Sequence, residues 1–176
     1  MRKAEREIKD FKLVEALLQR AEYVHLALWD GVSPYIVPVS FGYADKALYF
    51  HSSCKSRKAD CLRLCDRVGF SAVLEYDLKR MPKACDYTAH FRSVVGTGRA
   101  TLLQGREEKL RGLDIVMGHY GGPQGHYPEA VLDITCVVRV DVLEMTGKSN
   151  PPWQGDPVLE VEERGPGGGE FLDSAS

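Results

Sequence analysis

The sequence predicts a mainly β protein with a few helices, folded as a closed antiparallel barrel of six strands. Two observations support this prediction. Six segments alternate apolar and polar residues with a period of two, which is typical of half-buried strands. Short polar turns join several of them, and the regular exchange of strands and helices that marks a parallel sheet is missing. The expected strands are 23–29, 34–43, 48–51, 67–76, 87–103 and 132–145.

Three helices are expected beside these strands. Asp10 can cap the first, because a side-chain oxygen there accepts a hydrogen bond from the free N–H groups of the first turn. An apolar stripe at i, i+4 spacing follows it. The other two helices are expected at about 54–65 and from Gln104 to about Tyr120, and the unpatterned segment 77–86 is expected to be a mobile loop.

The length of 176 residues suits one domain with a real core. We expect the folded domain to span residues 1–148. Beyond it the apolar pattern is lost, and Gly and Pro accumulate. Residues 149–176 are therefore expected to form a flexible tail or arm.

Charge and cysteine content narrow the class of protein. The net charge of −2 gives no general attraction to nucleic acid or to an anionic membrane, and no apolar run reaches the ~18 residues of a membrane span. Five cysteines without a C-x-x-C pair, and a charged N-terminus without an apolar signal core, predict a cytoplasmic protein with reduced thiols. No metal site is expected, because structural zinc sites favour closely spaced cysteine knuckles.

The most unusual stretch joins the strand at 48–51 to the helix at 54–65. A helix N-terminus is the positive end of the helix dipole and usually collects acidic residues. Here the first turn carries Lys55, Arg57 and Lys58 instead. With free backbone N–H groups and the hydroxyls of Ser52, Ser53 and Ser56, these cations predict an anion site suited to a phosphate. A solvated basic face is the alternative.

Two further strand features each allow two interpretations. Pro38 removes a donor from its strand, which indicates either a plain edge strand or a strand whose free side faces a flat ligand. Gly96 and Gly98 point the same way in a long strand, and they mark either a sharp bend or the close approach of another group.

Four segments in this order resemble the pyridoxamine-phosphate-oxidase-like split-barrel flavoproteins. They are most similar to the nitroimidazole-resistance branch, which is nitroreductase-like and uses flavin. The resemblance covers about residues 5–148, and it depends on the order and spacing of motifs that are individually short. The segments are Pro34–Phe41, Phe50–Ala59 (read as Phe-His-Ser-x-x-x-Ser-Arg-Lys-Ala), Phe91–Gly98 and Thr146–Lys148.

This resemblance implies a six-stranded antiparallel split β-barrel that binds FMN at a homodimer interface, in the cleft between two barrels. Carried over to this chain, Ser56, Arg57 and Lys58 would hold the phosphate, with Ser53 beside them. His51 and Ser52 would lie near the ring or the ribityl chain. A flat ring beside smooth backbone would also explain Pro38 and the two glycines. Residues that would border the ring or approach it are Val37, Pro38, Val39, Ser40, Arg92 and Ser93.

The implied function is that of an FMN-dependent oxidoreductase, nitroreductase-like, acting on a small molecule. His51 is the candidate catalytic residue, and a hydrogen-bonded histidine at the barrel mouth is its alternative. A non-catalytic flavin-binding or redox-sensing module is the competing function. A split barrel that binds haem or deazaflavin is a further one, with His119 and His126 as candidate haem ligands.

Two departures from the pattern argue against oxidation of pyridoxamine phosphate itself. The true oxidases end in a segment with Trp, Arg and His that grips the substrate phosphate. Here Trp153 is followed by Gln154-Gly155-Asp156, and Arg164 is the one cation downstream. The oxidases also carry a basic residue where this chain has Ser40-Phe41.

Overall fold

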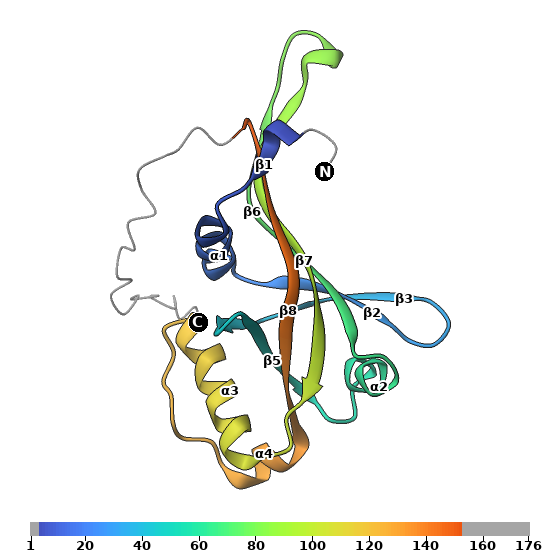
Figure 1. Cartoon of the computed structure of the whole chain (residues 1–176), viewed down its shortest axis with the longest axis vertical. Helices are drawn as coiled ribbons and strands as arrows, with labels where there is room; N and C mark the ends of the chain where they lie inside the picture. The colour runs from blue at the N-terminus through green and yellow to red at the C-terminus, as the bar shows by residue number, and fades with distance from the viewer. Residues whose placement is uncertain (1–3, 153–176) are drawn as a thin grey trace, which may run out of the picture.

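The computed structural model describes residues 4–152, and its centre is an antiparallel sheet of eight strands (Figure 1). The strands are β1 (Glu7–Ile8), β2 (Val24–Trp29), β3 (Pro34–Val39), β4 (Gly42–Ala44), β5 (Ala47–Ser53), β6 (Arg67–Lys79), β7 (Thr88–Leu102) and β8 (Thr135–Asn150). The helices are α1 (Phe11–Arg20), α2 (Arg57–Leu64), α3 (Arg106–His119) and α4 (Glu129–Ile134), with short 3-10 turns at Ala4–Arg6 and Ala84–Asp86.

The sheet confirms the mainly antiparallel β class but is open and not six-stranded. Its order is β3-β2-β6-β7-β8-β5-β4, and β1 pairs with β8. Within residues 4–152 no pairing joins β3 to β4, so the predicted closed ring of six strands is wrong. The expected strand 34–43 breaks at Ser40 and supplies both edges. At the break, the N–H of Phe41 donates to the hydroxyl of Tyr120 at 3.0 Å instead of to a strand.

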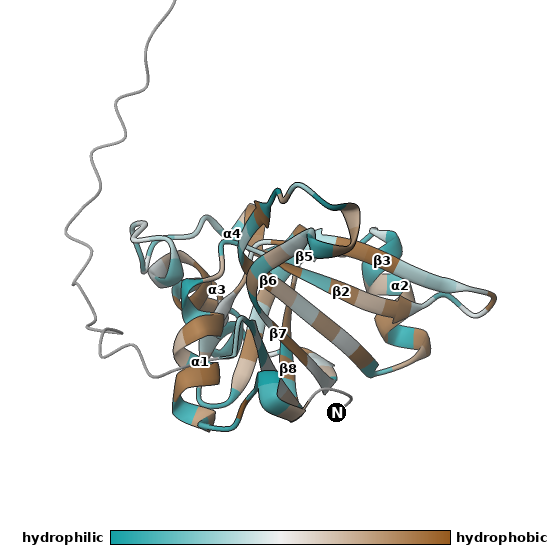
Figure 2. Cartoon of the chain, turned by 90° about the horizontal axis from the view of Figure 1, so that it is seen from above, coloured by the Kyte–Doolittle hydropathy of each residue, from teal (hydrophilic) through white to brown (hydrophobic). Residues whose placement is uncertain are grey.

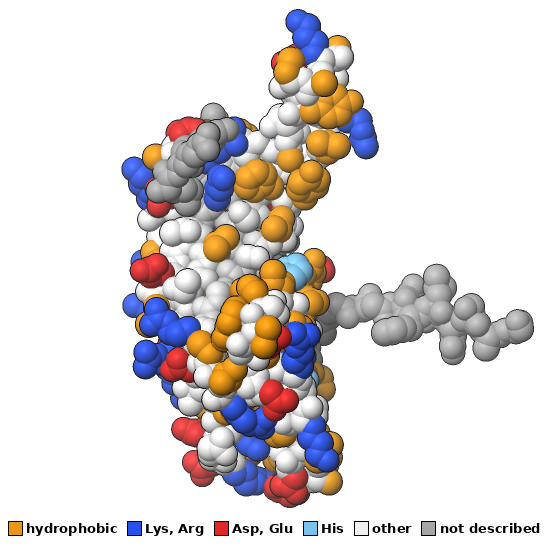
Figure 3. Space-filling view, turned by 90° about the vertical axis from the view of Figure 1, so that its right-hand side faces the viewer, with side chains coloured by type: hydrophobic (Ala, Val, Ile, Leu, Met, Phe, Trp, Pro, Cys, Tyr) orange, Lys and Arg blue, Asp and Glu red, His pale blue; other side chains and the backbone are white. Residues whose placement is uncertain are grey.

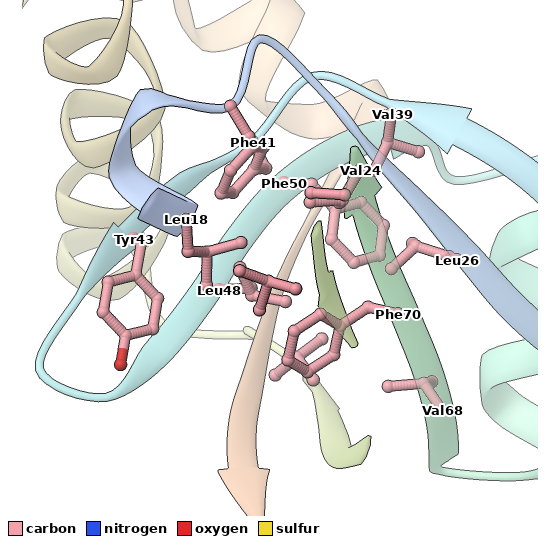
Figure 4. Close-up of a cluster of buried hydrophobic side chains, with 14 of the residues drawn as sticks. Leu18, Val24, Leu26, Val39, Phe41, Tyr43, Leu48, Phe50, Val68 and Phe70 are labelled. Carbon is pink, nitrogen blue, oxygen red and sulfur yellow. The ribbon is translucent and has the colours of Figure 1, made fainter. Parts of the chain in front are cut away.

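The main core lies between α1, α2 and one face of the sheet. In Figure 4, the side chains of Phe41, Phe50 and Phe70 are packed with those of Leu18 and Leu48. Fully burying one such side chain stabilises the fold by roughly 1.5–3 kcal/mol. The alternating apolar positions recognised in the sequence supply this core.

Helix α1 begins as the sequence predicts. The carboxylate of Asp10 accepts a hydrogen bond from the N–H of Lys12 at 2.9 Å. The helix buries Val14, Leu17 and Leu18 against the sheet. Gly147 of β8 permits this close approach, because a Cβ there would meet the side chain of Val14.

A second, smaller core lies under α3. It contains Tyr49, Leu113 and Val137, from β5, α3 and β8. Strand β5 is therefore covered on both faces, since Leu48 and Phe50 enter the main core. This explains why β5 begins as a continuous apolar run.

Several element ends differ from expectation. Strand β6 runs on to Lys79 and β7 begins at Thr88, so most of the expected loop 77–86 belongs to a hairpin that projects from the body (Figure 1, green, top). Residues expected at the start of the last strand form α4, and β8 continues through Asn150, past the predicted boundary at 148. Trp153 and the rest of the expected tail lie outside the described residues. Among the described helices, none is long and apolar enough to cross a membrane.

Candidate functional site

The β5–α2 turn holds the serines that the sequence assigns to a phosphate site. Ser52 is buried, and its hydroxyl oxygen lies 2.7 Å from that of Ser56. Ser56 caps α2, because its hydroxyl accepts a hydrogen bond from the N–H of Ala59 at 3.2 Å. Ser53 is exposed and accepts one from the N–H of Lys55 at 3.2 Å. The structure thus brings the three serines together at the start of α2.

Arg57 reaches from this turn to the β2–β3 turn. Its Nη2 donates to the carboxylate Oδ2 of Asp30 at 2.5 Å, and its guanidinium lies 4.3 Å from the ring centroid of Tyr35. The Arg57 side chain nevertheless keeps 58% of its surface exposed. Because a guanidinium carries five N–H donors, Arg57 can hold Asp30 and still donate to a ligand.

Asp30 is held as an anion. Its Oδ1 accepts hydrogen bonds from the N–H groups of Ser33 at 2.7 Å and Val32 at 2.9 Å. The N–H of Ser33, the guanidinium of Arg57 and the N–H of Val32, in that order, hold the pKa of Asp30 well below its usual range. The same contact raises the pKa of Arg57. A ligand at this turn therefore meets one fixed negative charge.

The remaining groups at the start of α2 fit a phosphate. Within residues 4–152, the ammonium groups of Lys55 and Lys58 form no ion pair. In the same range, the backbone N–H groups of Arg57 and Lys58 have no acceptor. Unpaired N–H groups at a helix start, next to cations and hydroxyls, are what phosphates bind. The residues present thus fit the phosphoryl end of FMN.

Strand β3, which was expected to border a flat ring, is an edge strand with two different faces. Val37 and Val39 turn toward the core, whereas Pro38 is exposed, as is Ser40 just beyond the strand. Pro38 lies opposite His25 of β2. An edge strand can contain a proline whether or not a ligand lies beside it, so its edge position alone explains Pro38. Only the outward side chains of this segment are available to a ring.

Gly96 and Gly98 face the core. A Cβ at Gly96 would collide with the ring of Phe70, and one at Gly98 would collide with Val140. Close approach applies to both glycines, and the approaching groups belong to the protein itself. At Gly98 the pairing of β7 with β8 also shifts register, so an irregularity of the strand applies there as well. The interpretation that both glycines make room for a flat ring is therefore wrong.

His51 lies on the face of β5 opposite to Ser52. Its side chain is exposed, and the residue pairs with Val137 of β8. The imidazole is therefore accessible to a substrate. Its catalytic role remains a prediction.

Arg92 and Ser93 lie far from the β5–α2 turn of the same chain. Arg92 pairs with Ser149 of β8, whereas His51 pairs with Val137 of that strand, twelve residues earlier. At about 3.3 Å per residue, this is a contour of about 40 Å. Arg92 donates to the carboxylate of Glu75 at 2.7 Å. One chain therefore does not bring all the predicted site residues together.

A groove elsewhere in the described residues and the candidate haem ligand His119 both lie away from this site. A groove of about 760 Å³ lies between α1, β4 and α3, and none of the predicted flavin residues lines it. His119 lies there, with its Nε2 2.8 Å from the carbonyl oxygen of Ala21 and its ring 4.6 Å from that of Phe41. These contacts leave His119 poorly placed to bind a haem iron.

Sequence reasoning missed two residues that contact Arg57 at the β5–α2 turn. They are Asp30 and Tyr35, and neither was connected with Arg57. No local signal links residues 27 positions apart. Only the placement of α2 beside β2 and β3, away from α1 and α3, brings them together (Figure 2).

The sequence matches the model of the family described as pyridoxamine 5'-phosphate oxidase over residues 12–149. Among solved structures, it is similar to a candidate 5-nitroimidazole antibiotic resistance protein from Bacteroides thetaiotaomicron. The two share 30% identity and a TM-score of 0.72, over 81% of this chain and 85% of that one. No curated protein matches the sequence.

Two more distant structures share the fold. A flavocytochrome from Azotobacter vinelandii has 23% identity and a TM-score of 0.70, over 93% of this chain and 76% of that one. An FAD- and haem-binding protein from Mycobacterium smegmatis has 15% identity and a TM-score of 0.73, over 86% and 76%. At these identities the likeness concerns the fold alone.

Proposed function

This chain belongs to the pyridoxamine 5'-phosphate oxidase family, and we propose that it binds FMN and acts as an FMN-dependent oxidoreductase on a small molecule. The main support for this proposal is the convergence of hydroxyls, unpaired N–H groups and unpaired cations at the start of α2. The resemblance to the Bacteroides thetaiotaomicron protein supports a 5-nitroimidazole as the acceptor. When bound, the flavin supplies the electron transfer, while the protein supplies binding and orientation.

In this proposal the phosphate is held by the start of α2. Ser53, Ser56, Lys58 and the exposed N–H groups of Arg57 donate to it. Hydrogen bonds to charged groups contribute about 1.5–3 kcal/mol each. His51 and Ser52 would lie closer to the ring and ribityl chain than to the phosphate, and the exposed imidazole of His51 is available to the substrate.

The cofactor would lie at the interface of a homodimer. The separation of Arg92 and Ser93 from the phosphate turn supports this arrangement, because two copies related by a two-fold axis can place the Arg92 end of one beside the turn of the other. The site would then be completed by the second copy.

The outer face of the sheet supports the same arrangement. Side chains on β3, β6 and β7 that turn away from the core include Ile36, Val73 and Val95, which are 65%, 61% and 53% exposed. Hydrophobic side chains also gather on the projecting β6–β7 hairpin and over the centre of the molecule (Figure 3). Exposed apolar patches of this kind mark interaction surfaces.

The free state of all five cysteines is in keeping with the expected cytoplasmic, reducing compartment. We retain that compartment as part of the proposal.

The phosphate assignment can be tested by flavin titration. Arg57→Ala with Lys58→Ala should weaken FMN binding by about 100-fold or more, since two charged hydrogen bonds are lost. Riboflavin lacks the phosphate, so its affinity should not change. Arg111→Ala with Lys12→Ala removes two exposed cations from α3 and α1 and should leave both affinities as they were. Unchanged FMN affinity in the first double variant would show that the phosphate lies elsewhere.

Activity and assembly need separate measurements. Flavin-loaded protein should be bleached anaerobically by NADPH or NADH and recoloured by a 5-nitroimidazole. Yellow protein that resists both donors would indicate a binding module, and a Soret band would indicate haem.

For assembly, Val95→Glu should halve the mass seen by light scattering and release FMN, while Gln19→Glu on α1 should do neither. A native monomer that retains FMN would refute the shared site.

A further inference from the structure

Cys54 and Cys136 form a pair of neighbouring thiols at the β5–α2 turn. The sheet register places Ser52 opposite Cys136, and the N–H of Cys54 donates to the carbonyl oxygen of Ile134 at 3.0 Å. The two side chains are close enough for Cys54 to contribute to the raised pKa of the Cys136 thiol. Both are partly exposed, so small reagents can reach them.

The other three cysteines have different surroundings. Cys61 is 2% exposed and belongs to the main core. The thiol of Cys65 donates to the carbonyl oxygen of Arg67 at 3.9 Å, and that of Cys85 to the carboxylate of Asp86 at 3.6 Å. Only Cys54 and Cys136 therefore combine exposure with a described thiol neighbour.

Two cations lie close to this pair. Arg63 donates from Nη2 to the carbonyl oxygen of Cys54 at 2.9 Å, and Lys109 donates from Nζ to that of Leu132 at 3.2 Å. Both positive charges act on Cys136. Burial, followed by the contact with Cys54, nevertheless raises the pKa of the Cys136 thiol, so that thiol keeps its proton. Cations beside a thiol pair favour nucleophilic attack by one of its sulfurs. Arg63 is bound to the backbone of Cys54 itself, so Cys54 is the expected attacking residue.

We propose that Cys54 and Cys136 are a peroxide-reactive dithiol that closes to an intramolecular disulfide between the β5–α2 turn and β8. Cys54 gives up its proton and its sulfur attacks one peroxide oxygen. The O–O bond breaks, and hydroxide leaves with the electron pair and takes up that proton as water, giving a sulfenic acid at Cys54. The Cys136 sulfur then attacks the Cys54 sulfur. The S–O bond breaks, the S–S bond forms, and the hydroxyl leaves as water with the Cys136 proton. Two thiols and one hydrogen peroxide give one disulfide and two waters.

The chain geometry permits this closure with a small movement. A disulfide needs Cα atoms about 4.4–6.8 Å apart, and diagonal neighbours across an antiparallel pair lie close to this range. Cys54 lies just after the last residue of β5, in the turn, so it can shift without breaking the strand. This reaction does not depend on flavin binding.

The experiment treats the full-length reduced protein with one equivalent of hydrogen peroxide and counts free thiols. The wild type should fall from five thiols to three, with a Cys54–Cys136 peptide found by mass spectrometry without reduction. Dithiothreitol should restore all five. Cys85→Ser, which removes the exposed cysteine on the β6–β7 hairpin, should still lose two thiols.

A second variant separates the two steps. In Cys136→Ser the disulfide cannot form, and dimedone should trap a sulfenic acid at Cys54. Retention of five thiols in the wild type, or oxidation that falls on Cys85 or links two chains, would overturn the proposal. Dimedone labelling at cysteines other than Cys54 in Cys136→Ser would overturn the assigned nucleophile.

Discussion

Nη2 of Arg57 lies 2.5 Å from Oδ2 of Asp30, so a cation at the start of α2 is held by an anion in the β2–β3 turn. The Arg57 side chain is 58% exposed and that of Asp30 18%. The ion pair therefore lies at the surface, and Asp30 is its more buried member. In the proposed site, Asp30 orients Arg57 and at the same time places a negative charge near the phosphate.

Asp30→Asn tests which of these two effects dominates. Asn keeps an acceptor for the N–H groups of Val32 and Ser33 but removes the charge. We expect FMN to bind about 2- to 5-fold more tightly, because the repulsion removed is that of one exposed charge, which contributes only weakly to the binding free energy. Riboflavin affinity should stay constant. Isothermal titration with both ligands measures this, and Asp45→Asn, whose partner is Arg111, is the control. Weaker FMN binding would mean that orientation of Arg57 outweighs repulsion.

His51→Ala tests the candidate catalytic residue. If the exposed imidazole acts on the substrate, kcat/KM for a 5-nitroimidazole should fall by about 100-fold, within the range for general acid catalysis. The unfolding midpoint should not change, because the side chain is outside both cores. Turnover is expressed per bound FMN, so that any loss of cofactor is separated from a loss of catalysis. His126→Ala, in the exposed loop after α3, should have no effect on turnover. Equal turnover in both variants would identify His51 as a plain surface histidine.

Gly96→Ala tests the assignment of this glycine to core packing. The added methyl would meet the ring of Phe70 and the carbonyl oxygen of Glu144. We expect a loss of about 1–3 kcal/mol in the free energy of unfolding, as in other overpacked cores. Gly69→Ala is the matched control on β6, because its Cβ would make an ordinary 3.5 Å contact with Ala27. Urea denaturation of both variants should show a loss in the first alone.

Tyr127→Phe tests a hydrogen bond with a defined pH dependence. The Tyr127 hydroxyl donates to Asp114 at 2.9 Å. Burial, and then this bond, raises the pKa of Tyr127 from 10.0 to about 12. Because the folded state binds the proton more tightly, this contribution to stability is complete below pH 10 and is lost between pH 10 and 12.

The wild type should therefore be more stable than Tyr127→Phe by about 1 kcal/mol at pH 8. That difference should shrink as the pH rises from 10 toward 12. Denaturant titrations at pH 8, 10 and 11 measure it, and the remaining tyrosines cancel in the comparison. A constant difference across these pH values would contradict the assigned bond.

Local spacing determined much of this protein. Alternation of apolar residues predicted the strands, because a side chain's face in a strand depends only on odd or even position. Asp10 capped α1 as expected, because a helix cap also depends only on two or three neighbouring residues. The serines and cations of the β5–α2 turn were also recognisable, because they are adjacent in sequence and meet at one helix start.

Tertiary structure alone decided what those residues face. The segment 34–43 supplies opposite edges of an open sheet, Arg57 meets Asp30, and Cys54 meets Cys136. Arg92 of β7 pairs with β8 about 40 Å along that strand from the β5–α2 turn, and Gly96 turns toward Phe70. All of these depend on strand order and register between segments distant in the chain. The strand order and register are selected by how the two cores pack together, and this packing cannot be predicted from local sequence patterns.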